Sequence, residues 1–189
     1  MPKETLFKFL DLVSAHVNNL KRSIDFDSVE RMIEAIESAN SIFVMGAGRS
    51  GYVAKAFAMR LMHLGYTVYV VGEAVTPRIK AEDVLIAISG SGETTSVVNI
   101  AKKAKEMIGS KLVAVTGREK STLADMADIV VVIRGKLKDE RDEDVSRLAP
   151  LGTMFELMAM VFLDALVAEI MARKSLTEKD LEMRHAVLE

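Results

Sequence analysis

The sequence predicts an α/β fold with a doubly wound, five-stranded parallel sheet of order 2-1-3-4-5, flanked by helices. Three observations predict it. Five short runs of apolar and β-branched residues alternate with segments of helical periodicity. The runs are apolar throughout, which is typical of parallel strands buried on both faces. Two of them end in glycine-rich loops that lead into helices, as expected of a doubly wound sheet.

Each element follows from its own stretch of sequence. Two amphipathic helices are expected within residues 2–38, the second with Asp27 as its N-cap. The α/β core is expected to cover residues 41–133. Its strands are expected at 41–45, 67–71, 84–88, 111–115 and 129–133, and its helices at 50–64, 94–108 and 122–126.

The chain after the sheet divides into two parts. Residues 134–148 are strongly charged and are expected to form a solvated linker or mobile flap. Residues 151–189 are expected to be helical: a long apolar helix ends near Arg173, and Thr177 can start a final helix. A length of 189 residues suits one core, so we interpret residues 1–189 as one domain.

Composition excludes several classes of function. The net charge is −2 and no basic stripe is present, which argues against nucleic-acid binding. The chain has no cysteine, hence no disulfide, thiolate nucleophile or cysteine-based zinc site. Glu156 and Asp164 interrupt the longest apolar stretch, so no membrane span is expected. Acidic residues occur early in the N-terminal segment, unlike a signal peptide, and the cytoplasm is the expected location.

Two loops share one chemistry. Residues 46–51 read Gly-Ala-Gly-Arg-Ser-Gly, and residues 89–95 read Ser-Gly-Ser-Gly-Glu-Thr-Thr. Glycines let backbone N–H groups turn inward, hydroxyls add donors, and a helix N-terminus follows each loop, a combination that suits phosphate. The expected strand order makes the first and third strands neighbours, so both loops should face one crevice. The candidate binding residues are Gly48, Arg49, Ser50, Ser89, Gly90, Ser91 and Thr94.

Other interpretations of these loops stay open. Gly46, Gly48 and Gly51 also fit the dinucleotide fingerprint, with Glu73 near the place of its ribose-binding acid. That interpretation leaves the hydroxyls of the second loop without a role and needs a substrate domain that the chain does not offer. Ser91 or Thr94 can instead be a helix cap, and Arg49 can be a surface residue. The Glu93 carboxylate is expected to point away from a bound anion.

Four motifs together resemble the SIS (sugar isomerase) domain family and, within it, the family of 6-phospho-3-hexuloisomerases. They are the two loops, Ala-Pro-Leu-Gly-Thr-Met-Phe-Glu at 149–156, and Arg-His-Ala-Val-Leu-Glu at 184–189. One departure is Val187, where the resemblance leads us to expect Asn. The resemblance covers almost the whole chain and implies conversion between arabino-hex-3-ulose 6-phosphate and fructose 6-phosphate, a step of the ribulose monophosphate pathway. It implies no metal and no organic cofactor.

The resemblance also implies roles for residues. Glu156 would be the base that moves a proton between neighbouring carbons through a cis-enediol, and His185 would be the active-site histidine. The partners implied are a phosphorylated ketohexose and three further copies of the chain, in a homotetramer where His185 reaches a neighbouring site. From spacing alone, Glu156 also fits a capping box with Thr153. His16 and His63 are interpreted as packing or surface residues.

Two other functions remain possible at this stage. One is an aldose–ketose isomerase acting on another phosphosugar, and the other is a non-catalytic phosphosugar sensor. A base at Glu156 favours an enzyme over a sensor.

Overall fold

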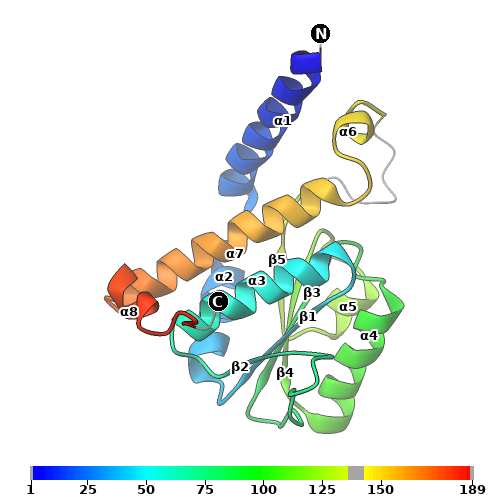
Figure 1. Ribbon diagram of the computed structural model, residues 1–189. Helices are drawn as coiled ribbons and strands as arrows, with labels where there is room; N and C mark the ends of the chain where they lie inside the picture. Colours follow the sequence, from blue (N-terminus) through cyan, green and yellow to red (C-terminus); the bar gives the residue numbers. More distant parts are fainter. Residues whose placement is uncertain (1, 136–142, 188–189) are drawn as a thin grey trace.

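Five parallel strands form the centre of the computed structural model, which describes residues 2–135 and 143–187 (Figure 1). The sheet order is β2-β1-β3-β4-β5, and every pairing is parallel, as the sequence predicts. The strands are β1 (Ile42–Gly46), β2 (Val68–Val70), β3 (Val84–Ser89), β4 (Lys111–Thr116) and β5 (Ile129–Val132).

Helices cover both faces of this sheet. Those of the core are α3 (Arg49–His63), α4 (Thr95–Lys102), which continues into the π-helical turns η1 (Lys103–Ile108), and α5 (Thr122–Met126). Two helices precede the sheet, α1 (Pro2–Ser23) and α2 (Phe26–Ser38). Three helices follow it, α6 (Glu143–Leu148), α7 (Thr153–Arg173) and α8 (Glu178–Glu182).

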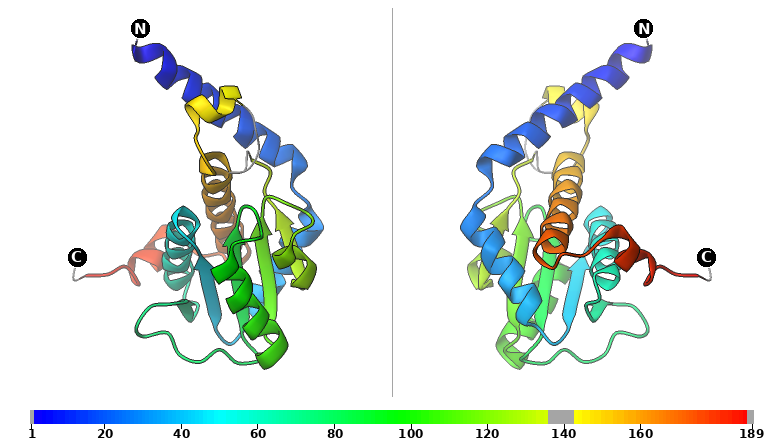
Figure 2. Two further views of the ribbon diagram at one scale, coloured as in Figure 1. Left: turned by 90° about the vertical axis from the view of Figure 1, so that its right-hand side faces the viewer. Right: turned by 90° about the vertical axis from the view of Figure 1, so that its left-hand side faces the viewer.

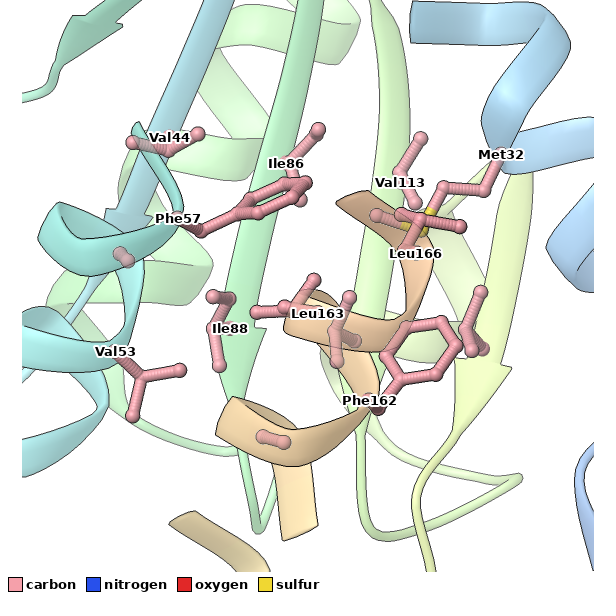
Figure 3. Close-up of a cluster of buried hydrophobic side chains, with 14 of the residues drawn as sticks. Met32, Val44, Val53, Phe57, Ile86, Ile88, Val113, Phe162, Leu163 and Leu166 are labelled. Carbon is pink, nitrogen blue, oxygen red and sulfur yellow. The ribbon is translucent and has the colours of Figure 1, made fainter. Parts of the chain in front are cut away.

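Successive strand residues point to opposite faces and bury two separate cores. On one face Val44 and Ile86 pack with α2, α3 and α7, and on the other Phe43 and Leu85 pack with α4 and α5. Figure 3 shows the larger core, where Phe57 of α3 and Leu163 of α7 lie over the strands. Burial on both faces is why the strands are apolar throughout rather than alternating.

Three local predictions need correction. The N-cap of α2 is Asp25, whose carboxylate accepts from the N–H groups of Asp27 and Ser28, so Asp27 lies inside the helix. Within the expected charged linker, α6 forms over Glu143–Leu148, whereas residues 136–142 lie outside the described part of the chain. The expected helix at 94–108 changes from α to π geometry at Lys103.

The first helix projects from the body of the molecule, as both views in Figure 2 show. Its apolar residues Leu6, Phe7 and Leu10 are more than half exposed. Nearer the body, α1, α2 and α7 line a mainly apolar groove of about 460 Å³. In the part of the chain that is described, no helix has both the length and the apolarity needed to cross a bilayer.

Candidate functional site

The two glycine-rich loops lie next to each other because β1 and β3 are neighbours. Gly46, the last residue of β1, pairs with Ile88, one residue before the end of β3. Residues 46–51 and 89–95, here called the loop pair, therefore leave the sheet side by side at its carboxyl edge. The strand order reverses at this point, since β2 lies on one side of β1 and β3 on the other. Ligands of doubly wound sheets bind at such a switch point.

The first loop turns sharply into α3 at Gly48. Gly48 is the N-cap residue, with a φ of 57° and a ψ of −131°. Residues with a Cβ rarely adopt this backbone conformation. A Cβ there would meet no atom within 4 Å, so backbone conformation rather than lack of space requires glycine. Ser50 is buried, whereas the Arg49 side chain is 61% exposed. The Arg49 side chain is therefore accessible from solvent.

The second loop brings two of its hydroxyls together. Ser89 Oγ lies 3.2 Å from Thr94 Oγ1, and Ser89 Oγ also accepts a hydrogen bond from the N–H of Gly92 at 3.2 Å. Thr94 occupies the N-cap position of α4, but its side chain makes no capping hydrogen bond. The Ser91 hydroxyl differs, because it accepts from the N–H of Glu93 in a local turn. A helix-cap role therefore does not account for the Thr94 hydroxyl.

Among the described residues, the N-cap side chains of three helices near the loop pair make no capping hydrogen bond. The structure gives no side-chain cap hydrogen bond to α3, α4 or α7, whose N-cap residues are Gly48, Thr94 and Gly152. By contrast, the carboxylate of Asp25 caps α2 and the hydroxyl of Ser121 caps α5. The uncapped N–H groups and the positive dipole ends of α3 and α4 are available to an anion beside the loop pair.

The segment after β4 supports the second loop from behind. The Glu93 carboxylate accepts from the N–H of Thr122 at 2.8 Å and from its hydroxyl at 2.6 Å. These two hydrogen bonds, with a smaller contribution from Arg118, hold the pKa of Glu93 below its ordinary value. The Glu93 carboxylate is therefore directed to the start of α5, and its orientation relative to a bound anion stays a prediction. The sequence could not predict the contact of Glu93 with α5, because Thr122 is 29 residues away along the chain.

Gly92 lies against the same segment. It has a φ of 67°, and a Cβ there would lie 2.0 Å from Ser121 Oγ. Its carbonyl oxygen accepts from the N–H of Leu123 at 3.0 Å, and that of Gly90 accepts from the N–H of Gly117 at 3.0 Å. The shape of the second loop is therefore set largely by residues 117–123.

Glu156 lies in the first turn of α7, and Arg49 reaches it from the start of α3. The Nε of Arg49 is 2.7 Å from Oε2 of Glu156, whose side chain is only 15% exposed. No described donor gives Oε2 an aligned hydrogen bond, so the contact with Arg49 is an ion pair without the geometry of a hydrogen bond. The tertiary contact of α3 with α7 thus brings Glu156 to the first loop.

The capping-box interpretation of Glu156 is wrong. The hydroxyl of Thr153 donates to the carbonyl oxygen of Pro150 at 2.7 Å, and the N–H of Glu156 bonds to the carbonyl oxygen of Gly152 at 3.1 Å. The Glu156 carboxylate instead faces Arg49, so this structure gives it no capping role.

His185 is not brought to the loop pair of its own chain. It lies at the C-terminal end of α3, where its ring stacks on that of His63, 5.2 Å between centroids. A helix of 15 residues at about 1.5 Å per residue places this end about 21 Å from Arg49. Figure 1 shows the C-terminal segment at that end.

Glu73, the residue of the dinucleotide interpretation, forms an ion pair with Lys55 on α3 at 2.6 Å.

The fold and the loop pair together define a doubly wound α/β domain with a glycine- and hydroxyl-rich loop pair at its switch point. The chain belongs to the SIS domain family, whose model matches residues 35–143.

Full-length relatives refine this assignment. The chain is 41% identical to the 3-hexulose-6-phosphate isomerase of Methanocaldococcus jannaschii over 95% of this chain and 96% of that protein. It is 38% identical to the enzyme of the same name from Methylomonas aminofaciens, with 96% and 99% covered. A crystal structure from Methanococcus jannaschii, for which a molecular function of 3-hexulose-6-phosphate isomerase was inferred, matches with a TM-score of 0.85. That match has 40% identity and covers 95% of this chain and 98% of the other.

Proposed function

We propose that this protein interconverts arabino-hex-3-ulose 6-phosphate and fructose 6-phosphate through a cis-enediol, as a cytoplasmic step of the ribulose monophosphate pathway. The coarser assignment is that the chain is a phosphosugar isomerase of the SIS family, a ketose isomerase. The particular pair of sugars is the finer part of the proposal, and the names of the full-length relatives support it.

One observation carries the proposal at the level of chemistry. A buried carboxylate oxygen of Glu156, without an aligned hydrogen bond from the described residues, lies 2.7 Å from the Arg49 guanidinium at the edge of a phosphate-type loop. A base must keep a free lone pair, and a cation beside it can stabilise negative charge that develops on a sugar oxygen. A non-catalytic phosphosugar sensor has no need of this arrangement.

The phosphate is assigned to the loop pair. The hydroxyls of Ser89 and Thr94 and the uncapped N–H groups of α3 and α4 offer neutral donors to a dianion. Gly48, Ser50, Gly90 and Ser91 complete the proposed cradle. Binding at the phosphate places the sugar chain toward Arg49 and Glu156 and orients it for proton transfer.

The reaction moves two protons. Starting from the 3-ulose, Glu156 removes the proton on C2, and the C3 carbonyl oxygen gains a proton as the C2=C3 enediol forms. Glu156 then returns its proton to C3, while the hydroxyl on C2 loses its proton and becomes the new carbonyl. Arg49 leaves Glu156 to stabilise the enediolate oxygen, and His185 moves the proton between the two oxygens. Atoms and charge balance without an added oxidant or reductant.

In this proposal His185 comes from a neighbouring copy. Within one chain it lies about 21 Å from Arg49 along α3, too far to reach the same sugar. The exposed apolar face of α1 supports association, since apolar faces of this kind usually mark interfaces. These observations support association, and we propose the homotetramer that the family resemblance implies.

Hydrogen exchange tests the proposed sugar pair. The protein is incubated with fructose 6-phosphate in D₂O, and the C1 and C3 protons are followed by NMR. Exchange at C3 is expected, because that proton is removed to form the C2=C3 enediol. Exchange confined to C1 would identify an aldose–ketose isomerase instead. Binding of the sugar without any exchange would identify a sensor.

A further inference from the structure

The His63 ring forms a platform under His185. His63 is the last residue of α3 and is only 2% exposed, whereas His185 is exposed. Their ring centroids are 5.2 Å apart with planes inclined by 25°, a stacked arrangement. His63 is thus part of the body of the molecule, and His185 rests on its outer face.

Arg184 fixes the segment that carries His185. Its Nη1 donates to the carbonyl oxygen of Asp180 at 3.1 Å and lies 3.5 Å from that of His63. The guanidinium lies directly over Gly65, where a Cβ would be 3.2 Å from Cζ. The Asp180 carboxylate in turn accepts from the N–H of Thr177 at 2.7 Å and so holds the start of α8. Contacts on two sides therefore define where the His185 ring lies.

The contacts of His185 also determine which ring nitrogen is available. Its Nδ1 lies 3.1 Å from the carbonyl oxygen of Ala186. A carbonyl oxygen only accepts, so Nδ1 carries the proton in this hydrogen bond. In the neutral ring, Nε2 then has the free lone pair needed to take a proton from a sugar hydroxyl.

Burial and nearby positive charge favour the neutral form of the His63 ring. Burial lowers the pKa of His63, and the nearby His185 and Arg60 lower it further. A neutral ring stacks on His185 without the repulsion of two imidazolium groups.

We propose that His63 is a positioning residue, whose buried ring holds the His185 imidazole for the reaction site of a neighbouring copy. This rests on the proposed function, in which His185 moves protons between sugar oxygens. Simple packing does not require an aromatic ring at position 63, because a leucine fills a similar buried volume. Positioning does require one, because a flat ring face orients the stacked imidazole.

Two substitutions separate positioning from packing. His63→Leu keeps an apolar side chain and loses the flat ring, whereas His63→Phe keeps the ring. We expect His63→Leu to lower kcat by roughly tenfold to 10²-fold with KM little changed, since a small misplacement of a reacting group has effects of this size. We expect His63→Phe to recover most of that loss. Equal kcat values for His63→Leu, His63→Phe and wild type would overturn the positioning role, and circular dichroism checks that both variants fold.

A double variant provides the second readout. If His63 acts only through His185, adding His63→Leu to His185→Ala lowers kcat no further. A loss of kcat in the double variant equal to the product of the two single losses would contradict the proposal. A His185→Ala variant with wild-type kcat would instead refute the proposed role of His185. If His185→Ala has a lowered kcat while His63→Leu has the wild-type kcat, the positioning role of His63 is refuted and the proposed function is not.

Discussion

Arg49 and Glu156 form an ion pair that joins the first turn of α3 to the first turn of α7, with 2.7 Å between Nε and Oε2. The two residues are far apart in the sequence, and the pair exists because α3 and α7 pack side by side on one face of the sheet (Figure 1). In the proposed mechanism, Arg49 must leave Glu156 before this carboxylate can act as the base.

Glu156→Gln should lower kcat by roughly 10²- to 10⁴-fold, because the amide keeps the shape of the side chain and removes the base. The melting temperature should change little, since the carboxylate caps no helix in this structure. Steady-state kinetics and thermal unfolding check both statements. Asp164→Asn, at an exposed carboxylate of the same helix, is the matched control and should keep wild-type kcat. A Glu156→Gln variant that retains full activity would remove Glu156 from the mechanism.

Ser89→Ala and Thr94→Ala should mainly raise KM, because phosphate is held alike in the ground state and the transition state. A hydrogen bond to a charged group is worth about 1.5–3 kcal/mol, so each KM should rise about 10- to 150-fold. Inorganic phosphate should inhibit competitively, and more weakly in both variants. Ser38→Ala is the control, since that hydroxyl donates within its own helix to Glu34. Tight NADH binding that sugar phosphates do not affect would favour the dinucleotide interpretation instead.

Glu93→Gln should destabilise the protein at neutral pH and weaken phosphate binding, because the second loop loses a charged partner at α5. Hydrogen bonds from Thr122 lower the pKa of Glu93 in the folded protein, from a reference value of 4.5. The stabilisation is therefore complete above pH 4.5 and is lost as the pH falls through the lower folded-state value. Urea unfolding from pH 7 to pH 3 should show the gap between wild type and variant closing in acid. A gap that stays constant over this range would contradict the assignment.

Subunits that lack Glu156 should complement subunits that lack His185. When Glu156→Gln and His185→Ala chains are mixed equally and allowed to exchange, about half of the two-fold interfaces are mixed, and one site of each has both native residues. About a quarter of wild-type activity should return. Mass spectrometry of differently labelled chains verifies the exchange. Proven exchange without recovery would place His185 outside the neighbouring site.

Charges on the projecting part of α1 should prevent association. Phe7 and Leu10 are 58% and 51% exposed in the single chain, so Glu at both positions should cost the folded subunit little. In the proposed tetramer the same charges would be buried, and burial of an unpaired charge is strongly unfavourable. Analytical ultracentrifugation should show smaller species and a parallel loss of activity. If the assembly formed by the double variant has the same mass as the wild-type assembly, this face of α1 is not part of the interface.

The sequence by itself determined the features that depend on near neighbours along the chain. The apolar runs predict the strands and the parallel order, because burial on both faces demands continuous apolar character. Glycines and hydroxyls placed after two strands predict the loop pair, because the carboxyl ends of neighbouring parallel strands lie together. The long helix ending at Arg173 and the helix starting after Thr177 are also confirmed.

Only the tertiary structure decided how side chains far apart in sequence meet. Asp25 and Asp27, on either side of Phe26, both suit the cap of α2, and the structure has Asp25 as the N-cap because the helix begins at Phe26. Glu156 fits a capping box by spacing, but the packing of α7 against α3 turned its carboxylate to Arg49. The contacts of Glu93 with Thr122 and of His185 with His63 likewise depend on where whole elements dock. Local sequence patterns set the conformation of each segment. Contacts between side chains of different segments form only once the hydrophobic cores have packed those segments together.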